Sequence, residues 1–414
     1  MTDATDALLA AQYEAYPYPK RDPREEAKRL IVGSPGHLRE IDHWVFGATR
    51  PAGRPLHALI AGGGTGDATV MLAQQMARAG RDGSVTWLDR SAAALRVARE
   101  RALARRLTNI VWEQRSLLDL PGSGLGPFDY VDCCGVLHHL PDPAAGLRAL
   151  TAVLAPGGGI GLMVYAPHGR TGVYMLQDAL ALLAPIAEAA PARIEIARRV
   201  LRHLPETAWF RFNRNFQDHI NGGDAGVHDL LLNPRDRAFT VPQLAALLAG
   251  AGLEATAWIE PLRYDPLPLL PDPKLRARAE TLDPTGRAAL AEALSGNMSA
   301  HVLYCRRASE PVVRADPMNP AAVPIGREVP GPEMPRFLRP DGGMTLVMDG
   351  LRVPLQLPAL APAILGLADG TRPVGAIAAA LHARGIAPAL FDRAWAETFR
   401  VLEHANRLLL APPD

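Results

Sequence analysis

The chain has 414 residues, 48% of them hydrophobic, which is enough for a buried core and predicts two or three domains. Its 44 Lys and Arg residues nearly balance 43 Asp and Glu residues, so no basic field favours nucleic acid or an anionic membrane as a partner. The three cysteines predict no disulfide framework, and neither a signal-peptide pattern nor a membrane-length apolar run occurs. We therefore expect a cytoplasmic protein without a membrane partner.

The N-terminal segment, residues 1–50, is predicted to be an ordered arm or cap. A short helix is expected around Leu8–Tyr16. A proline-rich turn follows over Tyr16–Pro23, where each proline biases the preceding residue toward an extended backbone.

Apolar runs then alternate with helical patterns in a region that we assign to residues 51–308. The predicted strands are Leu56–Ala61, Ser84–Leu88, Ile110–Gln114, Tyr130–Cys134, Gly159–Tyr165, Leu253–Ile259 and His301–Cys305. The predicted helices are Asp67–Arg78, Ser91–Leu107, Ala144–Leu154, Val241–Gly250 and Gly286–Leu294. This alternation predicts an α/β domain with a doubly wound, mostly parallel sheet.

Three further segments depart from this alternation. Residues 167–252 are helix-rich and too long for a simple connection, so we expect them to fold over a site as a lid together with the arm. Residues 309–340 are dense in proline and are predicted to be a linker. Residues 341–414 predict a hairpin over Met344–Val353, turning at Asp349-Gly350, and three helices.

The most informative motif is the glycine-rich loop between the first strand and the first helix. Glycine at 62, 63, 64 and 66 lets the backbone turn sharply and approach a ligand closely. Asp67 stands where a dinucleotide fingerprint needs glycine, and no Gly-Lys-Ser/Thr of a P-loop follows. Asp89, at the end of the next strand, is placed to hydrogen-bond ribose hydroxyls.

Two more blocks lie at strand ends. Gln114–Asp119 follows the third strand and offers Ser116 and Leu117 to the edge and face of an adenine. Cys133–Pro141 follows the fourth strand and contains Gly135.

These four blocks, in this order and with Ala155–Gly159 before the fifth strand, resemble the class I (Rossmann-like) S-adenosylmethionine-dependent methyltransferases. The resemblance implies a seven-stranded sheet with an antiparallel final strand, and S-adenosyl-L-methionine as the cofactor. The cofactor-binding residues that it implies are Gly62, Gly64, Gly66, Asp67, Asp89, Arg90, Ser116, Leu117 and Gly135. One position departs from the family pattern, because Ile60 stands where an acid is often found; Asp67 is the expected alternative partner for the amino group of the cofactor.

Methyl transfer needs two reactants held together, with a base only where the acceptor must lose a proton. No universal triad is therefore expected, and candidates for the acceptor side follow from position alone. They are Tyr16, Tyr18, Tyr165, His168 and His228, with Tyr13, Arg21, Arg170, Tyr174, Asp229, Asp236 and Arg237 as further candidates. The charged residues of 224–237 are expected to form a surface ion-pair network. No metal site is predicted, because neither Cys-x-x-Cys nor a His pair four residues apart occurs.

The C-terminal residues 341–414 resemble the PqqD-like winged-helix modules that bind peptides, which implies a small α+β domain. Its basic and acidic residues offset one another, so DNA is disfavoured and contact with a peptide or protein, or a homodimer, is expected. The favoured function is methylation of a peptide or protein side chain. The alternatives are a small metabolite or tRNA as the acceptor, or a non-catalytic regulatory protein that binds the cofactor.

Overall fold

A computed structural model describes residues 13–413, apart from the side chain of Asp218, so most of the predicted helix Leu8–Tyr16 lies outside the described residues. Seven strands form one sheet in the order β3-β2-β1-β4-β5-β7-β6. Strand β7 runs antiparallel to β5 and β6, and the other pairs are parallel. The strands are β1 (Leu56–Ala61), β2 (Gly83–Asp89), β3 (Ile110–Gln114), β4 (Phe128–Cys134), β5 (Leu154–Tyr165), β6 (Leu253–Ile259) and β7 (Ala300–Arg307). The predicted seven-stranded α/β sheet with an antiparallel final strand is confirmed.

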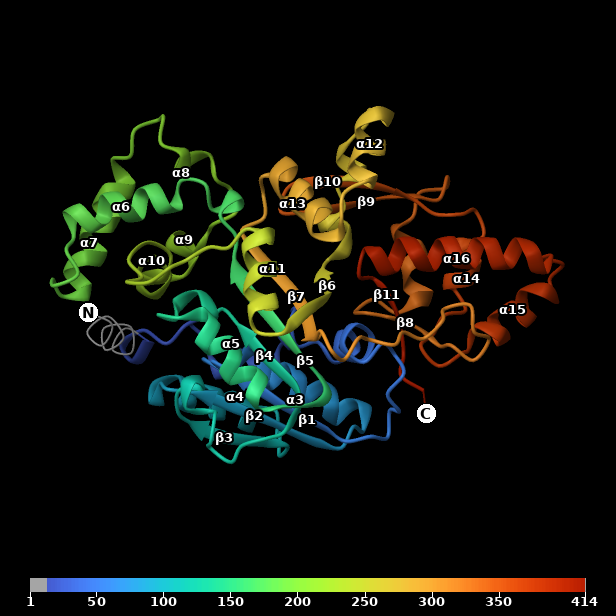
Figure 1. The fold of residues 1–414 in the computed structure, drawn as a ribbon, viewed down its shortest axis with the longest axis horizontal. Coiled ribbons are helices and arrows are strands. Elements are labelled where there is room, and N and C mark those ends of the chain that lie inside the picture. Colours follow the sequence, from blue (N-terminus) through green and yellow to red (C-terminus); the bar gives the residue numbers. More distant parts are fainter. Residues whose placement is uncertain (1–12, 414) are drawn as a thin grey trace.

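Helices cover both faces of this sheet (Figure 1). One face packs against α3 (Asp67–Ala79) and α4 (Ala92–Ala104), which contribute side chains such as Leu72 and Ala98 to the core. The other face packs against α5 (Pro143–Ala152) and α11 (Val241–Gly250). The short helices α2 (Leu38–Glu40) and η2 (Ile41–Val45) add apolar residues to the first face.

The helices between β5 and α11 form a separate layer at one end of the molecule, coloured green in Figure 1. They are α6 (Val173–Leu183), α7 (Ala190–Arg202), α8 (Trp209–Phe212), α9 (Asp218–Asn221) and α10 (Gly223–Leu231). They share a core of their own, against which Tyr16 of the arm packs. The helical character predicted for this segment is confirmed, and α11 belongs to the sheet domain.

The C-terminal module lies at the opposite end (Figure 1). Strands β9 (Gly343–Met348) and β10 (Leu351–Gln356) form the predicted hairpin, which turns at Asp349 and Gly350, both with positive φ. Its helices are α14 (Ala361–Leu365), α15 (Val374–His382) and α16 (Pro388–His404). Two features that the sequence did not predict are helix α12 (Pro273–Glu280), which precedes α13 (Pro284–Ser295), and the pairing of β8 (Pro324–Gly326) with β11 (Leu408–Leu410).

Strand β8 comes from the proline-rich segment, so residues 309–340 take part in the packing of the module. The module is joined to the sheet domain through a buried carboxylate, Glu40, which accepts hydrogen bonds from Ser34, Tyr304 and Asn406 and pairs with Arg327. The indole of Trp44 donates to Asn406, and Leu409 belongs to the core under the sheet. The two parts of the chain are therefore tightly packed together.

Candidate active site

A cavity of about 840 Å³ lies at the carboxyl ends of strands β1 to β5. Ile60, Asp89, Gln114, Cys134 and Tyr165, one from each strand, contribute to its lining. In an open parallel sheet this edge is where ligands bind. Every lining residue lies before β6, so the C-terminal module contributes none.

The glycine loop forms the floor of the cavity. Gly62 and Gly64 have φ values of +82° and +46°, and a Cβ on Gly62 would lie 2.2 Å from a methyl carbon of Val136. The amides of Gly62 and Gly63 donate to the carbonyl of Leu88 and hold the loop on the end of β2. Only glycine permits this turn and leaves the backbone open to a ligand.

Asp89 is fixed beside this loop. Its carboxylate accepts the amides of Gly64 at 2.9 Å and Ser91 at 3.0 Å. Burial raises the pKa of Asp89, so its charge depends on these donors and on a ligand that supplies more of them. This geometry fits a ribose whose hydroxyls donate to the carboxylate.

The residues expected to bind the cofactor mostly lie together. The cavity is lined by Gly62, Gly64, Asp67, Asp89, Arg90, Ser116, Leu117 and Gly135. Gly66 is not among the lining residues. It lies under the loop, where a Cβ would be 3.0 Å from the Cβ of Ala98, and it thereby lets the loop pack on α4.

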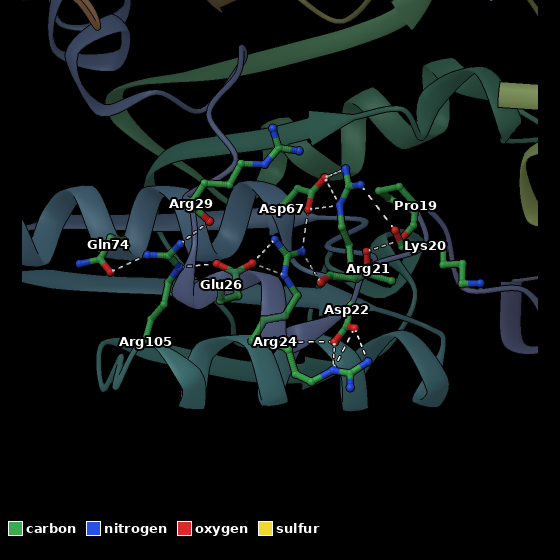
Figure 2. Close-up of polar contacts among 12 residues, drawn as sticks. Pro19, Lys20, Arg21, Asp22, Arg24, Glu26, Arg29, Asp67, Gln74 and Arg105 are labelled. Carbon is green, nitrogen blue, oxygen red and sulfur yellow. Dashed lines mark hydrogen bonds and ion pairs between the residues drawn. The ribbon is translucent and has the colours of Figure 1, made fainter. Parts of the chain in front are cut away.

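The arm lies against the glycine loop, and its Arg21 faces Asp67 at the end of that loop (Figure 2). Arg21 forms a two-pronged ion pair with Asp67, with N–O distances of 2.9 and 2.6 Å, and the Thr65 hydroxyl donates to the carbonyl of Pro19. Burial alone would raise the pKa of Asp67, but the hydrogen bond from Arg21 and the charge of Arg101 hold it below its ordinary value. The Asp67 carboxylate is thus already matched by two guanidinium groups.

Arg101 of α4 connects the arm to the loop. It donates to Glu26 of the arm, to the carbonyl of Thr65 and to Asp67, each at 2.6 to 2.8 Å. Glu26 is buried and also pairs with Arg105 (Figure 2). Three ion pairs therefore hold the arm on the cavity wall, and Tyr13, Glu14 and Tyr18 of the arm contribute to its lining.

A buried acid lies at the far end of the cavity. Asp229 of α10 is 5% exposed and accepts hydrogen bonds from the hydroxyls of Tyr13 at 3.2 Å and Tyr165 at 3.4 Å. Burial raises its pKa. Asp229 is the one cavity-lining residue from the described part of the 167–252 segment.

A buried ion pair supports this end of the cavity. Arg170 and Asp236 are joined at 2.9 Å, and the Arg170 guanidinium lies 3.8 Å from the centre of the Tyr165 ring. The expected surface network of residues 224–237 is therefore wrong for Asp229 and Asp236, whose side chains are buried. The helical layer closes this end of the cavity and keeps these acids away from water.

The candidates for the acceptor side divide into two groups. Tyr18 and Tyr165 line the cavity. Tyr16 and His228 instead stack on each other, with ring centroids 5.9 Å apart, and His168 is exposed. Glu14 and Asp132 line the cavity but were not predicted; the signal for Asp132 was a charged residue in the middle of an apolar strand.

Two negative observations concern the described residues. Among residues 13–413, no group of three His, Cys, Asp or Glu side chains could hold a metal ion. No helix in that range is long and apolar enough to cross a bilayer.

Comparisons with known proteins agree with this site. A family model described as a methyltransferase domain matches residues 59–160, which contain the glycine loop and β2 to β4. The structure of PKMT2 from Rickettsia typhi in complex with AdoHcy has the same fold, with a TM-score of 0.63 and 15% identity over 91% of this chain and 75% of that one. Fold, loop and family match define a class I S-adenosylmethionine-dependent methyltransferase, and its cofactor is S-adenosyl-L-methionine.

One relative in sequence shows the family to which the chain belongs. An uncharacterized protein from Synechococcus sp. is 30% identical over 318 residues, covering 75% of this chain and 74% of the relative. The chain belongs to the same family as that protein.

Shorter stretches of the chain are similar to enzymes whose names state an activity. Ubiquinone biosynthesis O-methyltransferases from Albidiferax ferrireducens and Acinetobacter baylyi are 36% and 32% identical over 28% and 37% of this chain. The chain covers only 42% and 60% of their lengths.

Proposed function

We propose that this methyltransferase acts on an amino group of a peptide or protein side chain. The observation that carries the proposal is Asp229, a buried carboxylate between the hydroxyls of Tyr13 and Tyr165 at the end of the cofactor cavity. A carboxylate beside aromatic rings binds a cation well, because the carboxylate supplies opposite charge and the rings supply a negative face.

For the cofactor, we propose that the carboxylate of Asp89 holds the ribose and that Ser116 and Leu117 contact the adenine. Gly62 and Gly64 then lie under the methionine part. Titration calorimetry with S-adenosylmethionine and S-adenosylhomocysteine tests this placement. We expect Asp89→Ala to weaken the binding of both ligands by about tenfold or more, because hydrogen bonds to a charged group are lost.

The cofactor would supply a methyl group on a sulfonium: the lone pair of the acceptor would bond to the methyl carbon, and the sulfide would leave as the carbon–sulfur bond breaks. The protein's task is to hold the acceptor in line and to accept its proton. An amine that enters as an ammonium must lose one proton before its lone pair can attack. Asp229 is suited to take that proton, because burial raises its pKa toward that of a useful base.

The helical layer beside Asp229 supports a macromolecular acceptor. Trp209 and Phe212 of α8 are exposed, although their rings lie 6.2 Å apart, and Leu182 of α6 is also exposed. Paired exposed aromatic side chains are typical of surfaces that contact another protein.

The test is to incubate a native proteome and, separately, its metabolite pool with isotopically labelled cofactor and the purified enzyme. We expect a labelled peptide whose label is on a side-chain nitrogen and disappears with Asp229→Asn. Label confined to RNA or to small molecules would contradict the proposal, and label nowhere would favour a non-catalytic regulatory protein.

A second candidate function is methylation of a hydroxyl on a small metabolite. It is favoured by the ubiquinone biosynthesis O-methyltransferases among the relatives. In that case Asp229 would accept the proton of a hydroxyl, and the label would appear on oxygen in the metabolite pool.

For the C-terminal module, we propose contact with the acceptor protein or another partner chain. Its hairpin β9–β10 is a two-stranded sheet, and Val347 is exposed on it. Exposed strand edges bind extended peptides through backbone hydrogen bonds. We expect Val347→Asp to raise the KM for a protein acceptor and to leave cofactor affinity unchanged.

A further inference from the structure

We infer that Asp132, a buried carboxylate of β4, is the residue that binds the α-ammonium group of the cofactor's methionine part. The inference rests on the proposed placement of that part over the glycine loop. It concerns the position where the sequence departs from its family, because Ile60 cannot accept a hydrogen bond from an ammonium group.

The strand register brings Asp132 to the place that Ile60 leaves apolar. Ile60 of β1 and Asp132 of β4 are direct partners in adjacent parallel strands, and both line the cavity. Side chains of paired residues lie on the same face of a sheet, so an acid at either position reaches the same region. Compared with the family pattern, the negative charge therefore lies on β4 and not on the neighbouring β1.

The other carboxylates of the cavity are already matched by donors. Glu14 accepts from Ser91 and Ala93, and Asp67 from Arg21 and Arg101. Asp89 accepts two amides of the loop region, as described above, and Asp229 accepts two tyrosine hydroxyls.

Asp132 is matched on one side only. Its Oδ2 accepts the hydroxyl of Tyr130 at 3.0 Å, and the backbone amide of Cys134 also lowers its pKa, whereas its Oδ1 is buried and forms no hydrogen bond of normal geometry with the described residues. A Cβ on Gly36 would lie 2.8 Å from Oδ2, so the backbone closes that side of the carboxylate.

Without a ligand, this arrangement destabilises the folded protein. A buried carboxylate without a cation is unfavourable, and burial raises the pKa of Asp132 to about 7. A ligand ammonium would supply both the missing donor and the missing charge. An unsatisfied buried polar group in a native protein calls for an explanation, and a ligand that supplies the missing donor is one.

The experiment compares two ligands on three proteins. The ligands are S-adenosylhomocysteine and its deaminated analogue, which has hydrogen in place of the α-ammonium group. The proteins are the wild type, Asp132→Asn, which keeps the shape and the Tyr130 hydrogen bond, and Asp229→Asn, a matched change of a buried cavity acid. Affinities are measured by calorimetry and folding by thermal unfolding.

We expect Asp132→Asn to weaken S-adenosylhomocysteine by about tenfold to a hundredfold and the analogue by less than about twofold, since one charge-assisted hydrogen bond is lost. Asp229→Asn should leave both affinities unchanged. An equal loss for both ligands, or no loss for either, would overturn the inference. Because neither ligand reports on the acceptor, a selective loss supports Asp132 even if the proposed acceptor is wrong.

Discussion

Glu40 and Asp229 are both buried carboxylates, yet their surroundings are opposite. Glu40 lies at the joint with the C-terminal module and is matched by Ser34, Tyr304, Asn406 and the cation Arg327. Asp229 lies at the end of the cavity, where its hydrogen-bond donors are two tyrosine hydroxyls.

The pKa values diverge accordingly. Burial by itself would raise the pKa of Glu40, but the charge of Arg327 and the hydrogen bonds outweigh it and lower the pKa. For Asp229 burial prevails and raises the pKa. A buried acid paired with a cation is a structural joint, whereas a buried acid held beside a cavity by neutral hydroxyls is available for chemistry.

The largest effect is expected for Asp229→Asn, which should change catalysis and leave stability unchanged. An amide cannot accept the acceptor's proton, so turnover should fall by about 10²- to 10⁴-fold, the usual contribution of a general base. Single-turnover rates with a labelled acceptor measure it. Cofactor affinity and thermal stability should stay near the wild-type values; a folded variant that turns over normally would remove Asp229 from the reaction.

The complementary change, Glu40→Gln, should act on stability alone. It leaves the buried Arg327 guanidinium with the partly exposed carboxylate of Glu328 as its remaining counter-charge, so the free energy of unfolding should fall by about 3 kcal/mol. Glu403→Gln is the control, since Glu403 pairs with His43 at the same joint but is partly exposed, and its change should be within about 1 kcal/mol. Urea unfolding measures both, and equal effects would contradict the assignment of Glu40 as the joint.

The contrast between local pattern and long-range packing also explains what the sequence could predict. Strand β1, the glycine loop and Asp89 follow from apolar runs, glycine spacing and the position after a strand, all of which are local. Arg21 and Arg101 are 46 and 34 residues from Asp67, and Tyr13 and Tyr165 are 216 and 64 residues from Asp229, so no pattern in the segments of these acids reveals their partners. The same reason hid the pairing of β8 with β11, which joins the proline-rich segment to the end of the chain.

The acids with raised pKa values also predict how stability depends on pH. Asp132 has a pKa of about 7 when folded and near 4 when unfolded, so between these values the folded state holds more protons. Its contribution to stability is therefore present at low pH and lost as pH rises through 7. We expect Asp132→Asn to gain about 1–3 kcal/mol over the wild type at pH 8 and little at pH 4, in urea unfolding without ligand. A pH-independent difference would contradict the raised pKa.

The smallest predicted effect concerns the arm, where two arginines three residues apart provide a matched pair. Arg21 bridges to Asp67 beside the glycine loop, whereas Arg24 pairs with Asp22 in solvent within the arm itself (Figure 2). Arg21→Ala should release one of three ion pairs that hold the arm over the cavity, and the cofactor should dissociate about 3- to 10-fold faster, because a half-exposed two-pronged pair contributes on the order of 1 kcal/mol. Arg24→Ala should leave the dissociation rate unchanged. Stopped-flow displacement gives both rates, and hydrogen exchange over residues 13–24 shows whether the faster release comes with a looser arm. If exchange in that segment is the same with and without cofactor in the wild type, the arm is a fixed wall of the cavity and not a lid.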